Sequence, residues 1–257
     1  MTNGIRTHLS AEHSAPQWIA GIVVALPEEL TTLTGRKLAQ GECFALSERI
    51  RVVYSGAGPE NAERSAKFLI NEGANCLISW GCAAALSPQL RPGDLVVPDQ
   101  VLASQQQLFN TDSGWVKHIQ SLMTPRSPVT TGLLAESSRI IAFSSDKQHI
   151  HSQTGAVALD METAGVMRAA WEARLPAIAI RAIADPVSMN LPQAVVQALN
   201  SQGKVELIKL LRYLLTHPWQ VPALIKLGLH FNAARKTLKS VAGQLSELTN
   251  FKAEADR

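Results

Sequence analysis

Short apolar runs rich in valine, isoleucine and alanine alternate with helical patterns along most of this chain. The clearest strand candidates are residues 19–26, 51–54, 76–80, 95–102 and 177–183, and weaker ones are residues 129–131 and 139–143. Helices are expected at residues 59–72 and from about residue 161 to residue 173, whereas residues 104–128 give little signal. Strands that alternate with helices at short spacing predict a mainly parallel sheet covered by helices. We therefore expect a three-layer α/β protein with a central, twisted, mixed but mainly parallel sheet.

The pattern changes near residue 203, where strand signals end and the chain reads as helices. His217 and Pro218 break this segment in two, because proline is not tolerated in a helix interior. We expect residues 1–17 to be a flexible polar leader and residues 18–202 to form the α/β domain. Residues 203–257 are expected to form a basic helical extension packed on or attached to that domain.

Composition limits the classes of function. The net charge of +3 over 257 residues is too small to indicate nucleic-acid binding. That charge is uneven, since residues 203–257 carry +5 and residues 1–202 carry −2. Cys43, Cys76 and Cys82 lack the spacing of a disulfide framework, which favours a reducing compartment. No apolar run is long enough to span a bilayer, so we expect a cytoplasmic protein.

Carboxylates stand where three of the apolar runs end. Glu28 and Glu29 follow the first run, Asp160 and Glu162 stand before the second helix, and Asp185 ends the last run. Ligands of open α/β sheets bind beyond the carboxyl ends of strands, so these acids could converge on one polar substrate.

Each acid also has an ordinary structural explanation. An acid in the first turn of a helix complements the helix dipole, which is the better interpretation of Glu28 and an alternative for Glu29 and Glu162. Asp160 is expected to cap a helix, and an aspartate before proline is common in turns. Functionally, Glu162 could accept hydrogen bonds from a vicinal diol and Glu29 could be a general base. Asp185 could be a general acid if a desolvated cleft raises its pKa.

Other motifs carry weaker signals. Residues 55–58 (SGAG) lack the third glycine and the acidic partner of a dinucleotide loop, so we discount NAD. His149 and His151 have no further ligand nearby, and we expect them in a surface loop rather than at a metal. Cys82 has no base close in sequence and is expected to be a packed small residue, not a nucleophile. No cofactor and no metal are therefore expected.

Taken together, the motifs resemble the superfamily of purine and uridine nucleoside phosphorylases and methylthioadenosine/S-adenosylhomocysteine nucleosidases. The matching segments, in the order of the family, are residues 21–30 (GIVVALPEEL), 55–58 (SGAG), 79–86 (SWGCAAAL), 91–97 (RPGDLVV), 159–164 (LDMETA) and 181–185 (RAIAD). They extend over about residues 19–200. The resemblance implies the fold of that family and cleavage of a nucleoside N-glycosidic bond.

Within the superfamily the chain is most similar to a bacterial subgroup associated with hopanoid lipid synthesis. The signs are a short middle region, the pair Asp185 and Pro186, and residues 210–219 (LLRYLLTHPW). This narrower resemblance implies a small-molecule or lipid-linked adenosyl nucleoside as partner, with adenosylhopane as substrate and adenine as product. We also expect a homodimer or higher homo-oligomer.

The resemblance implies a role for each acid. Asp185 would donate a proton to N7 of the leaving adenine, Glu162 would bind the ribose 2′- and 3′-hydroxyls, and Glu29 would activate water. Met161 would pack under the sugar. The further expected substrate contacts are Cys82, Ala83, Gly58 and Leu133. In residues 81–85 (GCAAA) a hydroxyl of the family's glycine-rich loop is lost, and the apolar Leu133 stands in the expected adenine-binding segment.

Two alternatives stay open. Phosphorylases of this type carry arginines where this chain has Glu29 and Trp80, and a carboxylate repels phosphate, so hydrolysis is preferred over phosphorolysis. A catalytically inactive binding protein of a lipid pathway is the third hypothesis, supported by the altered residues 83–85.

The basic tail is expected to pack on the body or at a dimer interface. Contact with the inner membrane surface is its alternative interpretation.

Overall fold

The computed structural model describes residues 18–123, 128–198 and 207–250. The strands are β1 Ala20–Val24, β2 Cys43–Ser47, β3 Ile50–Tyr54, β4 Cys76–Ala85, β5 Leu95–Val96, β6 Gln100–Leu102, β7 Leu108–Asn110, β8 Val129–Thr130, β9 Leu133–Glu136, β10 Ala158–Asp160 and β11 Ala177–Asp185. The helices are α1 Pro27–Leu30, α2 Pro59–Asn71, α3 Ser113–Met123, α4 Ser144–Thr154, α5 Thr163–Ala173, α6 Gln193–Ala198, α7 Leu207–Thr216, α8 Val221–Ala242 and α9 Leu245–Leu248, with a 3₁₀ turn η1 Pro218–Gln220 before α8. The predicted leader, residues 1–17, lies outside the described residues.

Within the described ranges the strands form one mixed 11-stranded sheet, with the order β2-β3-β1-β4-β10-β9-β6-β7 and with β11 beside β4. β3, β1, β4 and β11 run parallel, while β2 and β10 pair antiparallel with β3 and β4. β4 is the central strand because it pairs with β1, β10 and β11. The prediction of a mixed, mainly parallel α/β sheet is confirmed.

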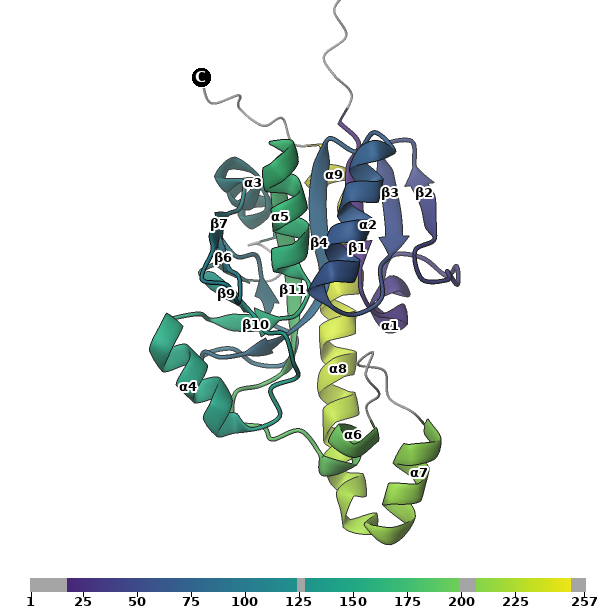
Figure 1. Ribbon diagram of the computed structural model, residues 1–257, viewed down its shortest axis with the longest axis vertical. Helices are drawn as coiled ribbons and strands as arrows, with labels where there is room; N and C mark the ends of the chain where they lie inside the picture. The colour runs from purple at the N-terminus through teal and green to yellow at the C-terminus, as the bar shows by residue number, and fades with distance from the viewer. Residues whose placement is uncertain (1–17, 124–127, 199–206, 251–257) are drawn as a thin grey trace, which may run out of the picture.

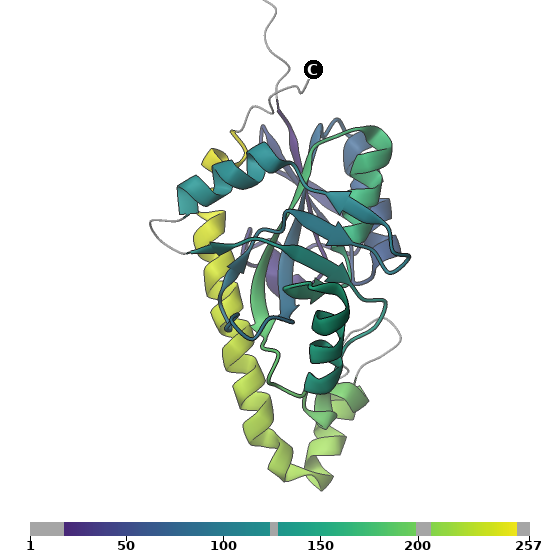
Figure 2. The same cartoon turned by 90° about the vertical axis from the view of Figure 1, so that its left-hand side faces the viewer.

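Helices cover both faces of this sheet (Figure 1). α2 and α5 pack on one face, and α3, α8 and α9 pack on the other, as Figure 2 shows from the side. α5 approaches α2 closely at Gly165, where a Cβ atom would collide with the carbonyl oxygen of Pro59. On the opposite face the second half of α8 buries Ala234, Leu238 and Val241. These layers fix the ends of β1, β4, β10 and β11 relative to one another.

The structure corrects several predictions in the middle of the chain. The expected strand at residues 95–102 is divided into β5 and β6 around Pro98, which has no N–H to donate to a ladder. The described part of residues 104–128 contains β7 and α3, which sequence reasoning missed. Residues 139–143 are not a strand, and α4 begins directly after them. His149 and His151 consequently lie on α4 and not in a loop.

The expected loop at residues 81–85 is also corrected, because β4 continues without interruption to Ala85. Strand geometry persists there because β11 pairs with β4 along this stretch. Small residues at these positions therefore do not supply loop freedom. They let other side chains pass close to the strand, as the site shows below.

The predicted break at His217 and Pro218 is confirmed. α7, η1 and residues 221–231 of α8 form a helical hairpin that projects from the body of the molecule (Figures 1 and 2). We call this hairpin the helical arm. Its exposed apolar side chains are Leu215, Trp219, Val221, Ile225 and Leu229. Among the described residues, none of the helices combines the length and the apolar character that a membrane span requires.

Candidate active site

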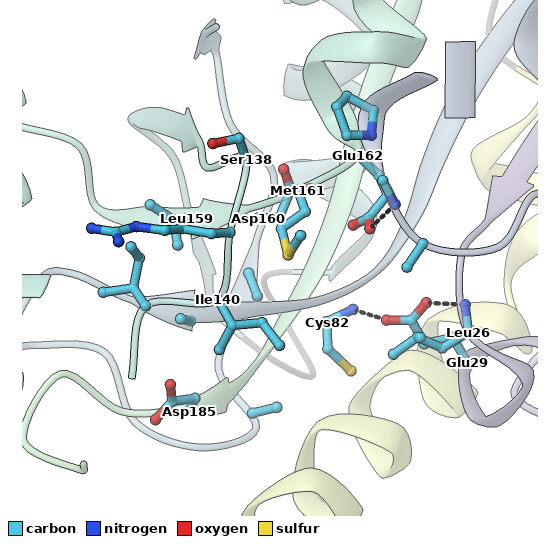
Figure 3. A pocket seen from close by; sticks show the side chains of 18 of the residues that line it. Leu26, Glu29, Cys82, Ser138, Ile140, Leu159, Asp160, Met161, Glu162 and Asp185 are labelled. Atoms are coloured by element: carbon cyan, nitrogen blue, oxygen red, sulfur yellow. Dashed lines mark hydrogen bonds between the residues drawn. The ribbon is translucent and has the colours of Figure 1, made fainter. Parts of the chain in front are cut away.

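A cavity of about 730 Å³ opens at the carboxyl ends of β1, β4, β10 and β11. Glu29, Glu162 and Asp185, the three acids with predicted roles, all line it, although 156 residues of sequence separate the first from the last. Figure 3 shows their side chains around the same space. The expected convergence of strand-end acids is therefore present in the structure.

Glu29 is held rigidly by backbone donors. Its Oε1 accepts a hydrogen bond of 2.8 Å from the N–H of Cys82, and its Oε2 accepts one of 3.1 Å from the N–H of Leu26. The bond to Leu26 also closes the first turn of α1, so Glu29 has a structural task besides any chemical one. Burial raises the pKa of Glu29 to about 7, although Arg181 opposes the shift. A carboxylate with such a pKa suits a general base near neutral pH.

Arg181 is a buried cation behind the acids, and sequence reasoning did not include it in the site. Its Nε lies 2.7 Å from Asp160 Oδ2, and its Nη2 donates to the hydroxyls of Ser79 and Thr163. A Cβ atom on Gly81 would lie 2.7 Å from Glu29 Oε1 and would collide with the guanidinium of Arg181. Gly81 is therefore required where these two side chains cross β4.

Asp160 takes the capping role that was expected of it. It accepts hydrogen bonds from the N–H and the hydroxyl of Thr163, the first residue of α5, and it also pairs with Arg181. Burial acts against a charged guanidinium, but Asp160, Glu29 and Glu162 raise the pKa of Arg181 above its ordinary value. One permanent cation thus offsets the negative charge on two sides of the cavity.

Glu162 is the residue directly before α5, and its side chain reaches across to α2. Its Oε1 accepts a hydrogen bond of 3.0 Å from the N–H of Gly58, which precedes α2 with a φ of 101°. Such a φ favours glycine. Burial and the neighbouring Asp160 raise the pKa of Glu162, whereas Arg181 opposes them. The predicted contact residues Gly58 and Met161 line the cavity beside it.

Asp185 ends β11, where the register between β11 and β4 shifts after Ile183. Such a bulge re-aims the side chain that follows it. Asp185 Oδ2 lies 2.7 Å from Nζ of Lys147, a residue of α4 that sequence reasoning missed. Asp185 Oδ1 is buried and has no hydrogen-bond partner. Burial raises the pKa of Asp185, with Lys147 and His230 opposing the shift.

The remaining predicted contacts divide in two. Cys82 and Ala83 line the cavity, and burial together with Glu29 raises the pKa of Cys82 well above its ordinary value. The thiol is therefore a poor nucleophile, as expected. Leu133 is not among the lining residues: it begins β9 and packs with a small apolar cluster that includes Leu86. Because β9 runs parallel to β10, its amino end, where Leu133 lies, points away from the cavity. The prediction that Leu133 contacts the substrate is therefore wrong.

The residues that follow the carboxyl end of β9 line the cavity in place of Leu133. They are residues 138–141, and Leu191 and Phe231 complete this wall. Phe231 lies on α8, in the segment that was expected to be helical, but no sequence signal linked it to the site. Arg181 did carry a signal, namely a lone charge within an apolar strand. Lys147 carried none, because α4 is polar apart from Ile150.

The site combines three acids with raised pKa values around one cavity, and backbone N–H groups hold two of them, Glu29 and Glu162. Two such acids can protonate a leaving group and deprotonate a nucleophile in the same complex. Within the described ranges, no group of three or more His, Cys, Asp or Glu side chains gathers where it could hold a metal ion.

The fold and this site place the chain in a known family. Residues 20–215 match the sequence profile of the phosphorylase superfamily, and the chain belongs to that superfamily.

Two relatives of the chain carry the same enzyme name. The 5′-methylthioadenosine/S-adenosylhomocysteine nucleosidase of Tolumonas auensis is 24% identical over 199 residues, which cover 68% of this chain and 84% of the relative. The enzyme of the same name from Staphylococcus aureus strain MRSA252 is 24% identical over 194 residues, covering 64% and 85%. The family and these relatives confirm the expectation that the chain is an enzyme.

Solved structures show the same fold. The Helicobacter pylori 5′-methylthioadenosine/S-adenosylhomocysteine nucleosidase with butyl-thio-DADMe-Immucillin-A superposes with a TM-score of 0.66 at 17% identity, over 92% of this chain and 99% of that one. The futalosine hydrolase of the same organism superposes with a TM-score of 0.65 at 16% identity, over 91% and 98%.

Proposed function

We propose that this protein hydrolyses the N-glycosidic bond of an adenosyl nucleoside and releases adenine. The observation that carries the proposal is the placement of Glu29, Glu162 and Asp185 on one cavity. In this proposal Asp185 protonates N7 of adenine, Glu162 holds the ribose 2′- and 3′-hydroxyls, and Glu29 takes a proton from the attacking water. The sugar passes through a transition state of oxocarbenium character, which the two glutamates stabilise. Met161, Cys82, Ala83 and Gly58 contact the substrate.

Hydrolysis is supported over phosphorolysis by the charge of the cavity wall. Arg139 is the only cation among the described lining residues, and its side chain is exposed. Glu29, Asp160 and Glu162 are negative neighbours that disfavour a bound phosphate. Water needs no cation, only a base, and Glu29 with its raised pKa supplies one.

The group on the ribose 5′ carbon is proposed to be large and apolar, with adenosylhopane as the substrate. This part of the proposal comes from the resemblance to the hopanoid-associated subgroup. It is supported by the apolar side chains Ile140, Leu191 and Phe231 on the cavity wall, of which Ile140 is partly open to solvent. A rigid hydrocarbon can bury area against such a wall, at roughly 25 cal/mol per Å².

A lipid-linked substrate must be met at a membrane, and we propose that the helical arm rests on an anionic bilayer surface. Trp219 is 66% exposed and Leu215 is 83% exposed at the tip of the arm. Residues 207–231 contain Lys209, Arg212 and Lys226 but no acid. Exposed apolar groups with cations are typical of helices that lie on anionic lipid. The cytoplasmic location and the homo-oligomer stay predictions.

One experiment tests the function. The protein is incubated with 5′-methylthioadenosine and, separately, with adenosylhopane, each with and without inorganic phosphate, and adenine is measured. Release without phosphate is expected, with adenosylhopane preferred in kcat/KM. Strict dependence on phosphate would show a phosphorylase instead. No release from either substrate would leave the inactive binding protein as the function.

A further inference from the structure

Lys147 is a buried cation that none of the roles above uses. It lies on α4, its side chain is 0% exposed, and its Nζ approaches three oxygen atoms. These are Oδ2 of Asp185 at 2.7 Å, the carbonyl oxygen of Met189 at 2.9 Å and that of Pro186 at 3.1 Å. A fully buried lysine is rare in proteins unless it is paired.

The three oxygens define the protonation state of Lys147. An ammonium group has three N–H donors, whereas a neutral amine has only two. Donation to all three oxygens therefore requires the charged form. Burial lowers the pKa of Lys147, but the carboxylate of Asp185 acts against that shift. The carbonyl oxygens of Pro186 and Met189 hold the ammonium in place. The position of the cation beside Asp185 therefore does not depend on substrate.

The two oxygens of Asp185 are consequently unequal. Oδ2 accepts from the ammonium of Lys147, while Oδ1 is buried without a partner on a residue that lines the cavity. An oxygen that accepts from an ammonium is a poor place for a proton. We propose that Lys147 is a positioning residue that directs the proton of Asp185 onto Oδ1, toward the leaving base, and stabilises the carboxylate left after the transfer.

This inference rests on the proposed function, in which one proton passes from Asp185 to the leaving base. The O–H bond at Asp185 Oδ1 breaks and an N–H bond forms at N7 of the base. The electron pair of the C1′–N9 bond passes to the base, and a water oxygen bonds to C1′ while Glu29 takes its proton. Asp185 ends as a carboxylate next to Lys147, with no net charge for the pair. Without the cation, that carboxylate would be left uncompensated in a buried site.

One other ionisable group acts on Asp185. His230 on α8 is near enough to oppose the shift of Asp185, and its own pKa is lowered by burial and by Lys226. Its Nδ1 is buried without a partner, so it makes no hydrogen bond to Asp185 through that atom. His230 therefore adds a weaker electrostatic influence and does not orient the carboxyl group.

The test compares Lys147→Met and Lys147→Gln with wild type in adenine release. Asp185 must be protonated to act, so activity falls as pH rises through its pKa. Removing the cation raises that pKa, and the basic limb of the kcat profile should move to higher pH by about one unit or more. kcat at the optimum should fall about tenfold or more, with KM little changed.

A double-mutant cycle separates positioning from a general structural role. In an Asp185→Asn background, Lys147→Met should leave the residual kcat unchanged, because the group that it acts on is gone. Lys117→Met at an exposed site on α3 is the matched control and should keep wild-type kinetics. Lys147→Gln keeps two N–H donors and serves if Lys147→Met does not fold, as judged by circular dichroism.

Two outcomes are decisive. The inference would be overturned if a folded Lys147 variant released adenine at the wild-type rate and kept the basic limb of its kcat profile in place. It would also be overturned if Lys147→Met lowered kcat equally in the wild-type and Asp185→Asn backgrounds. Either result would leave the proposed function intact. Absence of adenine release from the wild-type protein would instead overturn the proposed function.

Discussion

Arg181 Nε and Asp160 Oδ2 form a fully buried ion pair of 2.7 Å that ties β11 to β10 behind the cavity. The same aspartate caps α5 next to Glu162, and the same arginine opposes the burial-raised pKa of Glu29. One ion pair thus connects the segments that carry the three proposed functional acids. Its integrity should control both the stability of the fold and the protonation of the site.

Replacing Arg181 with methionine should destabilise the protein by about 3–5 kcal/mol, because Asp160 would then be a buried charge without its cation. The free energy of unfolding in urea measures this loss. Arg168→Met is the matched control, since Arg168 pairs with Glu63 at a partly exposed site where such pairs contribute about 0–1 kcal/mol. Equal losses in the two variants would contradict the central role of the buried pair.

The acidic limb of kcat/KM should have an apparent pKa of about 7, set by Glu29. Glu29 must be ionised to accept a proton from water, so activity is lost as pH falls through that value. Initial rates of adenine release across the pH range measure the limb. A limb near pH 4.5, the ordinary value of a glutamate, would show that Glu29 is not the base.

The same raised pKa predicts a pH dependence of stability. A glutamate whose pKa is higher in the folded state stabilises that state below its unfolded value, and this contribution is lost as pH rises toward about 7. The stability difference between wild type and Glu29→Gln should therefore move in favour of the variant by up to about 3 kcal/mol between pH 4.5 and pH 8. Parallel unfolding curves at both pH values would refute the raised pKa.

The strands were predictable where the apolar pattern of the sequence matches the faces of the strand that are buried in the structure. The runs that became β1, β3, β4 and β11 are continuous and apolar, because both of their faces are covered by helices. The runs between β4 and α4 gave poor predictions because Pro98 divides the first into two short strands, and residues 139–143 form no strand although they are largely apolar. α4 itself is polar and buries Lys147, so its sequence shows no apolar stripe.

The acids of the site were predictable for a related reason. A carboxylate directly after an apolar run stands at a strand end, and the carboxyl ends of the parallel strands β1, β4 and β11 share one edge. Glu162 reaches the same cavity although β10, which precedes it, runs antiparallel to β4. Arg181 and Lys147 act from behind that edge through three-dimensional contacts that no sequence spacing encodes. Leu133 was placed wrongly because a motif position was transferred without knowing where β9 begins.

Gly81→Ala should cost about 1–3 kcal/mol and reduce turnover, because its Cβ would displace Glu29 and Arg181 from β4. Gly228→Ala is the control, since nothing lies within 4 Å of its added Cβ and the residue is inside α8. An alanine there should stabilise the helix by about 0.5–1 kcal/mol. Thermal unfolding and kcat of both variants provide the comparison, and a neutral Gly81→Ala would mean that the crossing side chains can move aside.

The helical arm should bind vesicles of phosphatidylcholine and phosphatidylglycerol, and Trp219→Ser combined with Ile225→Ser should weaken that binding strongly. Trp219 and Ile225 are 66% and 60% exposed on the arm, so their loss removes apolar area without disturbing the core. Trp171→Ser is the matched control, because Trp171 is 65% exposed but lies on α5 in the body. Co-sedimentation measures the bound fraction.

Each arm cation near anionic lipid contributes about 1 kcal/mol, so binding should also fall as salt is added and on vesicles of phosphatidylcholine alone. Equal binding of the arm variant and wild type would show that the arm does not carry the membrane contact, whereas equal weakening by Trp171→Ser would show that any exposed tryptophan suffices.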